Sequence, residues 1–238
     1  MKKVQQHYDD VADIYDDRYD RDQGRYYHAH IRSQIACHLP NEGVLLDLGC
    51  GTGLFVQEYV RAGGRAVGLD ISPKMVEKAQ RRCRESGFVV GTADVLPFRD
   101  NTFDALASLL AFSYVPDPEG MLKEAYRVLK PGGSIAICTL GHNIFTSAVP
   151  FIYQVGEKVG LKKVGVGDFG EHYYSEKEIQ ELLAGAGFVD VDTNRCSFAH
   201  LALRGPVFRL ARSVEPFVEE HIPYLAYNVC GSGRKPER

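Results

Sequence analysis

The stretch Val44–Phe55 reads Val-Leu-Leu-Asp-Leu-Gly-Cys-Gly-Thr-Gly-Leu-Phe, and it decides the fold. Its opening residues are mostly apolar on both faces of an extended chain, which is typical of a buried parallel strand. Gly49, Gly51 and Gly53 follow at alternate positions and allow a tight turn on which a ligand can lie. A helix that begins after the turn would direct its free N–H groups at that ligand. The stretch therefore predicts a nucleotide-type cofactor site at the carboxyl end of a first strand.

The spacing of the glycines and one acid separate the candidate cofactors. The dinucleotide pattern G-x-G-x-x-G fails because its last position would be Leu54 or Val56, and no Gly-Lys-Ser/Thr of a phosphate-binding loop follows. Asp47 stands just before the turn, where a carboxylate repels a pyrophosphate and attracts a cation. These features favour a ligand with an ammonium or sulfonium group over NAD. A glycine turn that only lets a helix pack on a strand is the alternative interpretation.

Length, charge and cysteine content exclude several classes of protein. The chain has 238 residues and a formal net charge of −3, so we expect one domain without the basic surface of a nucleic-acid-binding protein. No apolar run approaches the length of a membrane span, and the polar start of the chain is unlike a signal peptide. These features predict a cytoplasmic protein. The six cysteines are far apart in the sequence, which predicts reduced thiols and neither a disulfide framework nor a zinc site.

Residues 1–40 predict a helical segment in front of the core. Apolar and aromatic side chains recur at helical spacing over 4–19, and Tyr15 and Tyr19 belong to this stripe. Two interpretations stay open. The segment is either a helix docked by its tyrosine face or a lid, because tyrosine combines an apolar body with a polar tip. A second helix is expected over 24–38.

Strands and helices alternate through residues 44–140, the expected cofactor-binding core. The patterns predict strands at 44–48, 65–69, 88–91, 103–109 and 134–140, and helices at 54–62, 73–86 and 118–129. Ser72 and Pro73 form an N-terminal helix signature. Asp70 lies about 20 residues past the first glycine, where a doubly wound fold places the acid that binds ribose hydroxyls. The alternation predicts an α/β, doubly wound, Rossmann-like fold with a parallel sheet.

The alternation stops at Gly141. Residues 141–173 are too many for a simple connector and predict an inserted cap that forms a pocket wall. Residues 174–238 predict the rest of the sheet. This part would contain a helix at 176–186 opened by a capping box, a strand at 188–194, a helix at 206–220, a last strand at 222–229 and a solvated basic tail at 231–238. We expect residues 1–238 to form one domain.

Four motifs in register resemble a known family. They are Leu46-Asp47-Leu48-Gly49-Cys50-Gly51-Thr52-Gly53, Gly68-Leu69-Asp70-Ile71-Ser72, Ala93-Asp94-Val95-Leu96-Pro97-Phe98 with Phe103-Asp104, and Val128-Leu129-Lys130-Pro131-Gly132-Gly133. With them the chain resembles the class I S-adenosylmethionine-dependent methyltransferases, and within these the small-molecule branch of the ubiquinone and menaquinone C-methyltransferases. Residues 8–16 are similar to the N-terminal signature of that branch. The resemblance implies a seven-stranded sheet whose last strand runs antiparallel.

The resemblance also implies which residues bind S-adenosylmethionine and its product, S-adenosylhomocysteine. Asp47 and the carbonyl group of Leu109 would hold the ammonium group, Asp70 the ribose hydroxyls, and Asp94 the adenine amino group. Tyrosines of the N-terminal segment would close over the cofactor. The expected cofactor-binding set is Tyr15, Tyr19, Asp47, Gly49, Cys50, Gly51, Gly53, Asp70, Ile71, Met75, Ala93, Asp94, Val95 and Leu109.

One departure from the family pattern concerns the methyl acceptor. Many relatives carry a His-His pair where this chain has Ser113-Tyr114, so their substrates and bases do not transfer. We expect an in-line displacement of the sulfonium methyl by an oxygen, nitrogen or carbon nucleophile of a small molecule, which depends mainly on orientation. No catalytic residue is assigned. Candidate bases, each more often a pocket-wall residue, are His142, His172, Tyr114 and Tyr173. The expected substrate pocket contains Ser113, Tyr114, His142 and His172.

Other functions stay open at this point. An RNA or protein methyltransferase shares the same cofactor half, although the acidic balance disfavours RNA. A non-catalytic S-adenosylmethionine-binding protein shares every motif, whereas the glycine spacing disfavours a dinucleotide oxidoreductase. No metal site is expected, because two histidines without a third ligand do not make a zinc site. The sequence also leaves open whether the protein forms a homodimer.

Overall fold

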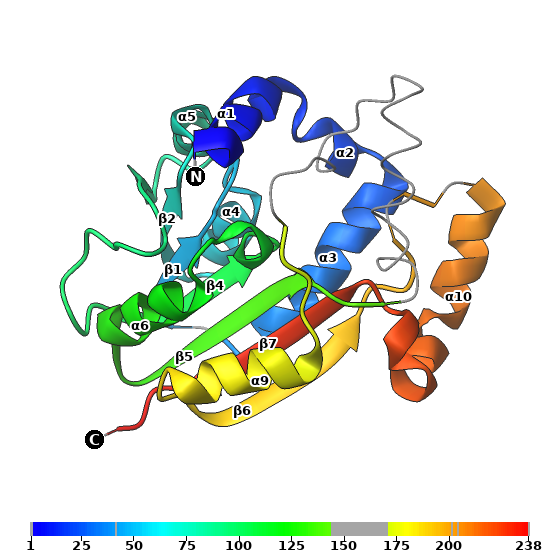
Figure 1. Ribbon diagram of the computed structural model, residues 1–238. Helices are drawn as coiled ribbons and strands as arrows, with labels where there is room; N and C mark the ends of the chain where they lie inside the picture. Colours follow the sequence, from blue (N-terminus) through cyan, green and yellow to red (C-terminus); the bar gives the residue numbers. More distant parts are fainter. Residues whose placement is uncertain (1, 41, 144–170, 201, 204, 238) are drawn as a thin grey trace.

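The computed structural model describes residues 2–40, 42–143, 171–200, 202–203 and 205–237 (Figure 1). Its centre is a seven-stranded sheet in the order β3-β2-β1-β4-β5-β7-β6. The strands are β1 (Val44–Leu48), β2 (Arg65–Asp70), β3 (Gly87–Val90), β4 (Phe103–Leu109), β5 (Leu129–Leu140), β6 (Val189–Cys196) and β7 (Asn228–Arg234). The first five pair in parallel, and β7 pairs antiparallel with both β5 and β6. This order confirms the predicted doubly wound sheet and its antiparallel last strand.

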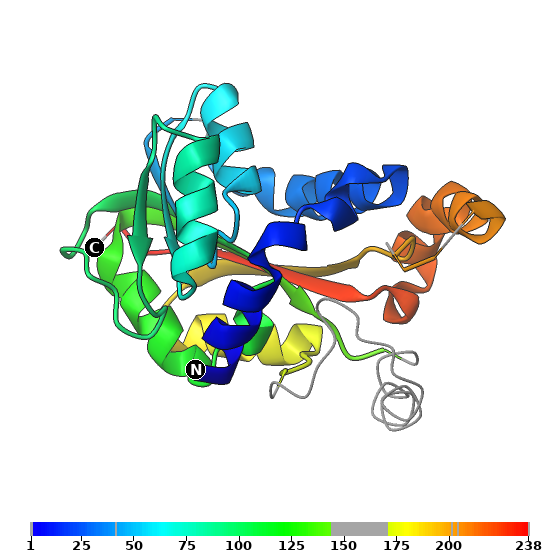
Figure 2. The ribbon, with the colours of Figure 1, turned by 90° about the horizontal axis from the view of Figure 1, so that it is seen from above.

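Helices cover both faces of the sheet (Figures 1 and 2). They are α1 (Lys2–Val11), α2 (Asp17–Asp20), α3 (Asp22–Ala36), α4 (Leu54–Arg61), α5 (Pro73–Arg82), α6 (Pro118–Val128), α9 (Glu176–Gly185) and α10 (Gly205–His221), with short 3-10 turns η1 (Ala12–Ile14), η2 (Phe112–Tyr114) and η3 (Pro223–Leu225). Tyr27 of α3 and Phe55 of α4 belong to the core on one face. Met121 of α6 and Ile179 of α9 belong to the core on the other. The sheet is therefore buried on both sides.

The strand β1 contributes to both cores. Leu45 packs in the core beneath α3 and α4, whereas Leu46 and Leu48 pack in the core beneath α6 and α9. All three leucines are fully buried. Because successive side chains point to opposite faces of a sheet, a strand that is covered on both sides needs apolar residues at nearly every position. The run that opens the glycine stretch meets this requirement.

The predicted helix starts are confirmed by contacts at the caps. The hydroxyl of Ser72 accepts a hydrogen bond from the Met75 N–H at 3.1 Å, and Pro73 is the first residue of α5. Ser175 and Glu178 form the expected capping box at the start of α9. The cap of α5 matters for the site because it lies directly after Asp70, at the carboxyl end of β2.

The prediction for the last strand was wrong. A strand at 222–229 and a solvated tail at 231–238 were expected, but the strand is β7, and its residues 228–233 are buried. Glycines inside it suggested a tail. The structure explains them by close packing: a Cβ atom added at Gly231 would lie 2.4 Å from Cγ2 of Ile179 in α9, and one added at Gly233 would lie 3.1 Å from Cβ of Phe188. Glycine lets α9 approach this strand.

Other boundaries differ from the predictions as well; α5, for example, ends at Arg82 and not at residue 86. The tyrosine stripe at 4–19 is not one helix, because α1 ends at Val11 and the chain turns through η1 before the short helix α2. β5 begins at Leu129 and not at residue 134, because Leu129 already pairs with Phe103 before the register shifts. The turn after α1 redirects the N-terminal segment, and its contacts belong to the site described below.

The expected cap at 141–173 lies largely outside the described residues, since the description stops at 143 and resumes at 171. Within the described part of the chain, no helix combines the length and the apolar character that a membrane crossing needs.

Candidate functional site

A cavity opens at the carboxyl ends of β1, β2 and β4, and the N-terminal segment forms part of its wall. It contains about 800 Å³ of space, counting its open mouth. Predicted site residues that line it are Tyr15, Gly49, Gly51, Asp70, Ile71, Ala93, Asp94, Leu109 and Tyr114. Residues from five separate parts of the sequence therefore meet at the edge where a doubly wound fold binds its ligand.

The glycine turn has the backbone conformation that the sequence predicts. Gly49, Gly51 and Gly53 have φ values of +76°, +51° and +78°. A Cβ atom on Gly49 would lie 2.1 Å from the Cβ atom of Ala111, whereas one on Gly53 would lie 2.9 Å from that of Ala79 in α5. The first glycine therefore lets the loop after β4 approach the turn, and the last lets α4 and α5 pack together. Gly53 is outside the cavity lining, so its contact is structural.

Asp70 links the glycine turn to the start of α5. Its Oδ2 accepts a hydrogen bond from the Gly51 N–H at 2.8 Å, and its Oδ1 accepts one from the Ser72 N–H at 2.9 Å. Burial raises the pKa of this carboxyl to about 6, although the backbone N–H groups act in the opposite direction. At neutral pH the group is therefore ionised and faces the cavity.

Two other carboxyl groups fit a ligand that donates hydrogen bonds. The Oδ1 atoms of Asp47 and Asp94 are both buried and make no hydrogen bond within the described residues. Burial, and secondly the nearby Asp70, raise the pKa of Asp47 to about 8. A buried polar atom without a partner destabilises the protein, and a ligand that donates a hydrogen bond to it would remove this cost. Asp47 lies behind the turn and outside the cavity lining.

We predict that Asp47→Asn stabilises the ligand-free protein at pH 8. The folded pKa of about 8 exceeds the usual value of about 3.9 for an unfolded aspartate. Folded Asp47 therefore keeps a proton that the unfolded chain has lost, so this group destabilises the fold progressively as pH rises from about 4 to about 8. If Asp47→Asn raises the free energy of unfolding by about 1 kcal/mol, Tm increases by about 2–4 °C. Thermal unfolding at pH 5 and pH 8 measures it. An increase in Tm that is equal at both pH values, or larger at pH 5, contradicts the raised pKa of folded Asp47.

Three acids of the N-terminal segment bond to the elements around the cavity. Asp9 accepts a hydrogen bond from the Ser72 hydroxyl at 2.6 Å, and Asp16 accepts one from the Thr52 hydroxyl at 2.6 Å. Asp16 also pairs with Arg82, and Asp13 pairs with Lys78 of α5 at 3.0 Å. The sequence pattern identified the tyrosines of this segment but missed these contacts. Val4, Tyr8 and Tyr15 of the same segment line the cavity.

Arg18 was also missed by the sequence reasoning. Its Cζ atom lies 3.6 Å from the ring centre of Tyr15 and 5.0 Å from that of Tyr19. Its Nε atom is buried and makes no hydrogen bond, and the guanidinium pairs with no carboxylate in the described part of the chain. In the sequence, Arg18 stands three residues after Tyr15, a spacing that brings two side chains together on a helix. This spacing is the signal that could have identified the contact.

Tyr114 lies against the ring of Tyr8 at the cavity wall. Its ring centre lies 5.9 Å from that of Tyr8 in an edge-on arrangement. Burial raises the pKa of the Tyr114 phenol to about 12. The group therefore keeps its proton at neutral pH and serves as a hydrogen-bond donor, which weakens its candidacy as a base.

Several predicted residues lie outside the cavity lining. These are Tyr19, Asp47, Cys50, Gly53, Met75, Val95, Ser113, His142, His172 and Tyr173. Val95 is exposed, and Met75 is fully buried. The Ser113 hydroxyl is buried and bonds to the Thr139 hydroxyl at 2.6 Å. His172 borders a separate hollow between α6 and α9. The ligand-binding roles expected of these residues remain predictions.

Comparisons with known proteins agree with this geometry. A family model described as "Methyltransferase domain" matches residues 46–137. The chain is 33% identical over 178 residues to demethylmenaquinone methyltransferase of Tropheryma whipplei strain Twist, which covers 68% of this chain and 74% of that protein.

The chain belongs to the class I S-adenosylmethionine-dependent methyltransferases.

Other members of this family show the same relationship. The chain is 34% identical over 169 residues to a ubiquinone/menaquinone biosynthesis C-methyltransferase of Desulfotalea psychrophila, covering 64% of this chain and 68% of that protein. Among solved structures, an S-adenosylmethionine-dependent methyltransferase from Thermotoga maritima superposes with a TM-score of 0.73 at 24% identity, covering 97% and 99% of the two chains. The predicted family, enzyme class and cofactor are thus confirmed: this methyltransferase uses S-adenosylmethionine.

Proposed function

We propose that this methyltransferase transfers a methyl group to a small molecule bound in the 800 Å³ cavity. The observation that carries the proposal is a pair of buried Oδ1 atoms that make no hydrogen bond within the described residues. One belongs to Asp47, just before the glycine turn, and the other to Asp94 in the cavity lining. They match the ammonium end and the amino-bearing ring of the cofactor. Asp70 would bind the ribose hydroxyls between them, and the carbonyl group of Leu109 would assist Asp47. The remaining space at the aromatic wall would receive the acceptor.

In this arrangement the cofactor supplies an electrophilic methyl group, and the protein orients the two reactants. Orientation alone can contribute about 7–11 kcal/mol to the lowering of the barrier. Tyr8, Tyr15 and Tyr114 would exclude water from the transfer path and fix the acceptor on the side of the cavity away from Asp94. No side chain needs to form a bond to the methyl group. The neutral Tyr114 hydroxyl would donate a hydrogen bond to the acceptor.

A small-molecule acceptor is favoured over RNA or protein by two facts. The relatives are named demethylmenaquinone methyltransferase and ubiquinone/menaquinone biosynthesis C-methyltransferase, and their names point to small molecules. The formal net charge of −3 gives no general attraction to a polyanion. A metabolite screen that detects S-adenosylhomocysteine tests the proposal, with total RNA and a protein extract as separate arms. The proposal is overturned if turnover occurs only with RNA or protein. It is also overturned if no metabolite fraction is methylated although the protein binds the cofactor.

We further infer that the acceptor carries an acidic group that binds Arg18. The guanidinium of Arg18 pairs with no carboxylate within the described residues. It lies against the ring of Tyr15, which lines the cavity, although Arg18 itself is outside the lining. A cation without a counter-ion in a partly buried site favours an anionic ligand. A carboxylate or an acidic phenol on the acceptor would supply it.

We predict that Arg18→Gln lowers kcat/KM for the acceptor found in the screen by about 10- to 100-fold, the usual value of a lost charged hydrogen bond. The affinity for S-adenosylhomocysteine should stay within about twofold, and Arg18→Lys should recover part of the activity. Arg25→Gln is the matched control, because Arg25 is exposed and pairs with Asp22. If Arg18→Gln instead weakens S-adenosylhomocysteine binding, the guanidinium serves the cofactor's own carboxylate and the inference about the acceptor is wrong.

A further inference from the structure

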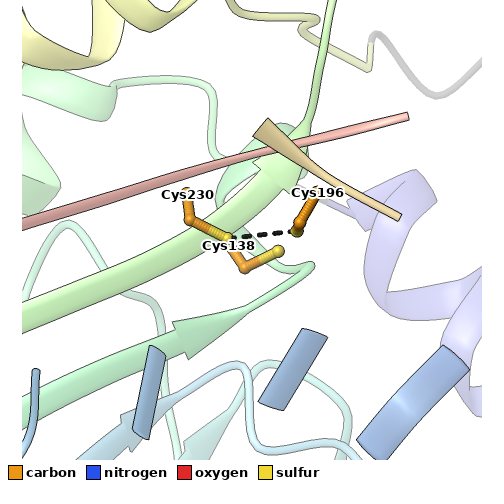
Figure 3. A group of neighbouring side chains, drawn as sticks. All are labelled: Cys138, Cys196 and Cys230. Carbon is orange, nitrogen blue, oxygen red and sulfur yellow. Dashed lines mark hydrogen bonds between the residues drawn. The ribbon is translucent and has the colours of Figure 1, made fainter. Parts of the chain in front are cut away.

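Three cysteines that are far apart in the sequence meet inside the protein. Cys138 is on β5, Cys196 ends β6, and Cys230 is on β7, and these strands are neighbours in the order β5-β7-β6. Figure 3 shows their side chains converging on one point between the strands. The three sulfur atoms lie within 4.8 Å of one another, and the sulfurs of Cys196 and Cys230 are 3.5 Å apart.

The surroundings of this three-cysteine cluster are apolar. All three residues are at most 2% exposed, and they share one core with Tyr27, Ile31 and other side chains of α3. The Ser197 hydroxyl donates a hydrogen bond to the Cys196 sulfur at 3.6 Å. Cys138 pairs with Leu109 of the cavity wall, but none of the three cysteines lines the cavity. The methyl transfer proposed above therefore does not explain the cluster.

A second group of candidate metal ligands shows the contrast. His30, Glu215 and Glu219 also come together, but both glutamates already accept hydrogen bonds from the backbone. Glu215 accepts the Ala199 N–H at 2.7 Å, and Glu219 accepts the Ser197 N–H at 2.6 Å and contacts His30 at 2.8 Å. These carboxylates fix α10 to the chain after β6. Within the described residues, the three thiols make no comparable hydrogen bond to the backbone that would account for their grouping.

From this geometry we propose that Cys138, Cys196 and Cys230 form a three-sulfur site for a soft monovalent metal ion of the Cu(I) type. Three sulfurs bound to one ion at about 2.3 Å in a plane lie roughly 4 Å apart, which agrees with the observed grouping. Thiolate ligands select soft ions such as Cu(I) and Zn(II), and a structural zinc site needs a fourth ligand. In the part of the chain that the structure describes, no fourth histidine, cysteine or carboxylate joins the three sulfurs.

Binding would proceed without any redox change. Each thiol that becomes a ligand releases one proton to solvent, and the ion keeps its charge. The bound ion would connect β5, β6 and β7 beneath α3, so the site would stabilise the far half of the sheet. This role is independent of S-adenosylmethionine and of the acceptor.

Anaerobic titration with Cu(I) in competition with a chromogenic chelator tests the proposal. The parent protein should be Cys37→Ser, since Cys37 is the exposed thiol. We expect one equivalent to bind, and each of the changes Cys138→Ser, Cys196→Ser and Cys230→Ser to weaken binding by at least about 100-fold. Cys83→Ser is the matched control, because Cys83 is buried elsewhere and bonds to Ser86. It should bind like the parent.

Further measurements keep the proposal testable if the serine variants unfold. Copper K-edge absorption of the loaded parent counts the sulfur ligands without any substitution in the cluster, and three are expected. Protein refolded with Cu(I) shows whether burial blocks entry into the folded chain. Failure of both folded and refolded protein to compete with the chelator overturns the proposal. The proposal is also overturned if copper K-edge absorption shows fewer than three sulfur ligands, or if Cys83→Ser weakens Cu(I) binding as much as the cluster variants do. Tighter binding of Zn(II) than of Cu(I) overturns it as well.

Discussion

Replacement of Asp70 by alanine is expected to weaken the binding of S-adenosylmethionine by about 10- to 150-fold, or about 1.5–3 kcal/mol. The ionised carboxylate would accept hydrogen bonds from the ribose. It also accepts the N–H groups of Gly51 and Ser72, so its loss frees the glycine turn and the start of α5. Isothermal titration calorimetry measures the change. Asp22→Ala is the control, since the Asp22 side chain is 91% exposed and lies in the N-terminal part of the chain.

The pH dependence gives a second readout for Asp70. The pKa of about 6 means that the carboxyl gains a proton as pH falls through that value and accepts fewer hydrogen bonds. Cofactor affinity should therefore fall on acidification below about pH 6 in the wild type, and the alanine variant should lack this step. An alanine variant with wild-type affinity, or one that keeps the step, shows that Asp70 does not bind the cofactor.

Deletion of residues 2–20 is expected to leave a folded protein with kcat/KM lowered by at least about 100-fold. The deletion ends before α3, whose Tyr27, Ile31 and Ile35 remain in the core. It removes Val4, Tyr8 and Tyr15 from the cavity wall. With them the enzyme would lose the proposed exclusion of water and orientation of the acceptor. Circular dichroism and thermal unfolding check the fold, and the S-adenosylhomocysteine assay measures turnover. A truncated enzyme with full activity removes the lid interpretation.

Point variants separate the anchoring of this segment from its contacts with ligand. Asp16→Asn removes the charge that pairs with Arg82 in a partly buried contact and weakens the hydrogen bond from Thr52. Asp13→Asn removes only the charge of a pair whose aspartate is 87% exposed. Exposed pairs contribute little, so Asp16→Asn should lower activity more than Asp13→Asn does. The reverse order would mean that the segment is held by other contacts.

The sequence predicted best where structure depends on local rules. β1, the glycine turn and the cap at Ser72 follow from apolar runs, positive φ values and helix-start chemistry within a few residues. The prediction failed at β7, because glycine there reflects contact with Ile179 of α9, which is about fifty positions away in the chain. Local composition indicated a tail where tertiary packing makes a strand.

Some residues of the site could be predicted from local sequence, and others could not. Asp70 and Asp94 belong to recognisable motifs that follow strands, so their place at the cavity follows from the order of strands. Arg18 depends on the turn after α1, which a helical stripe does not reveal. The cysteine cluster depends on the insertion of β7 between β5 and β6, so spacing along the sequence gives no sign that Cys138, Cys196 and Cys230 meet.

The position of β7 has a consequence for the order in which the protein is made. β6 is synthesised before β7, yet β7 is the strand that connects it to the sheet. Until residues 228–234 leave the ribosome, β5 and β6 each expose an unpaired edge to other nascent chains. The helix α10 has already been synthesised at that point. Its contacts with Ser197 and Ala199 would shield the end of β6 until β7 pairs with it. Chaperone dependence during synthesis should therefore be concentrated in this late interval.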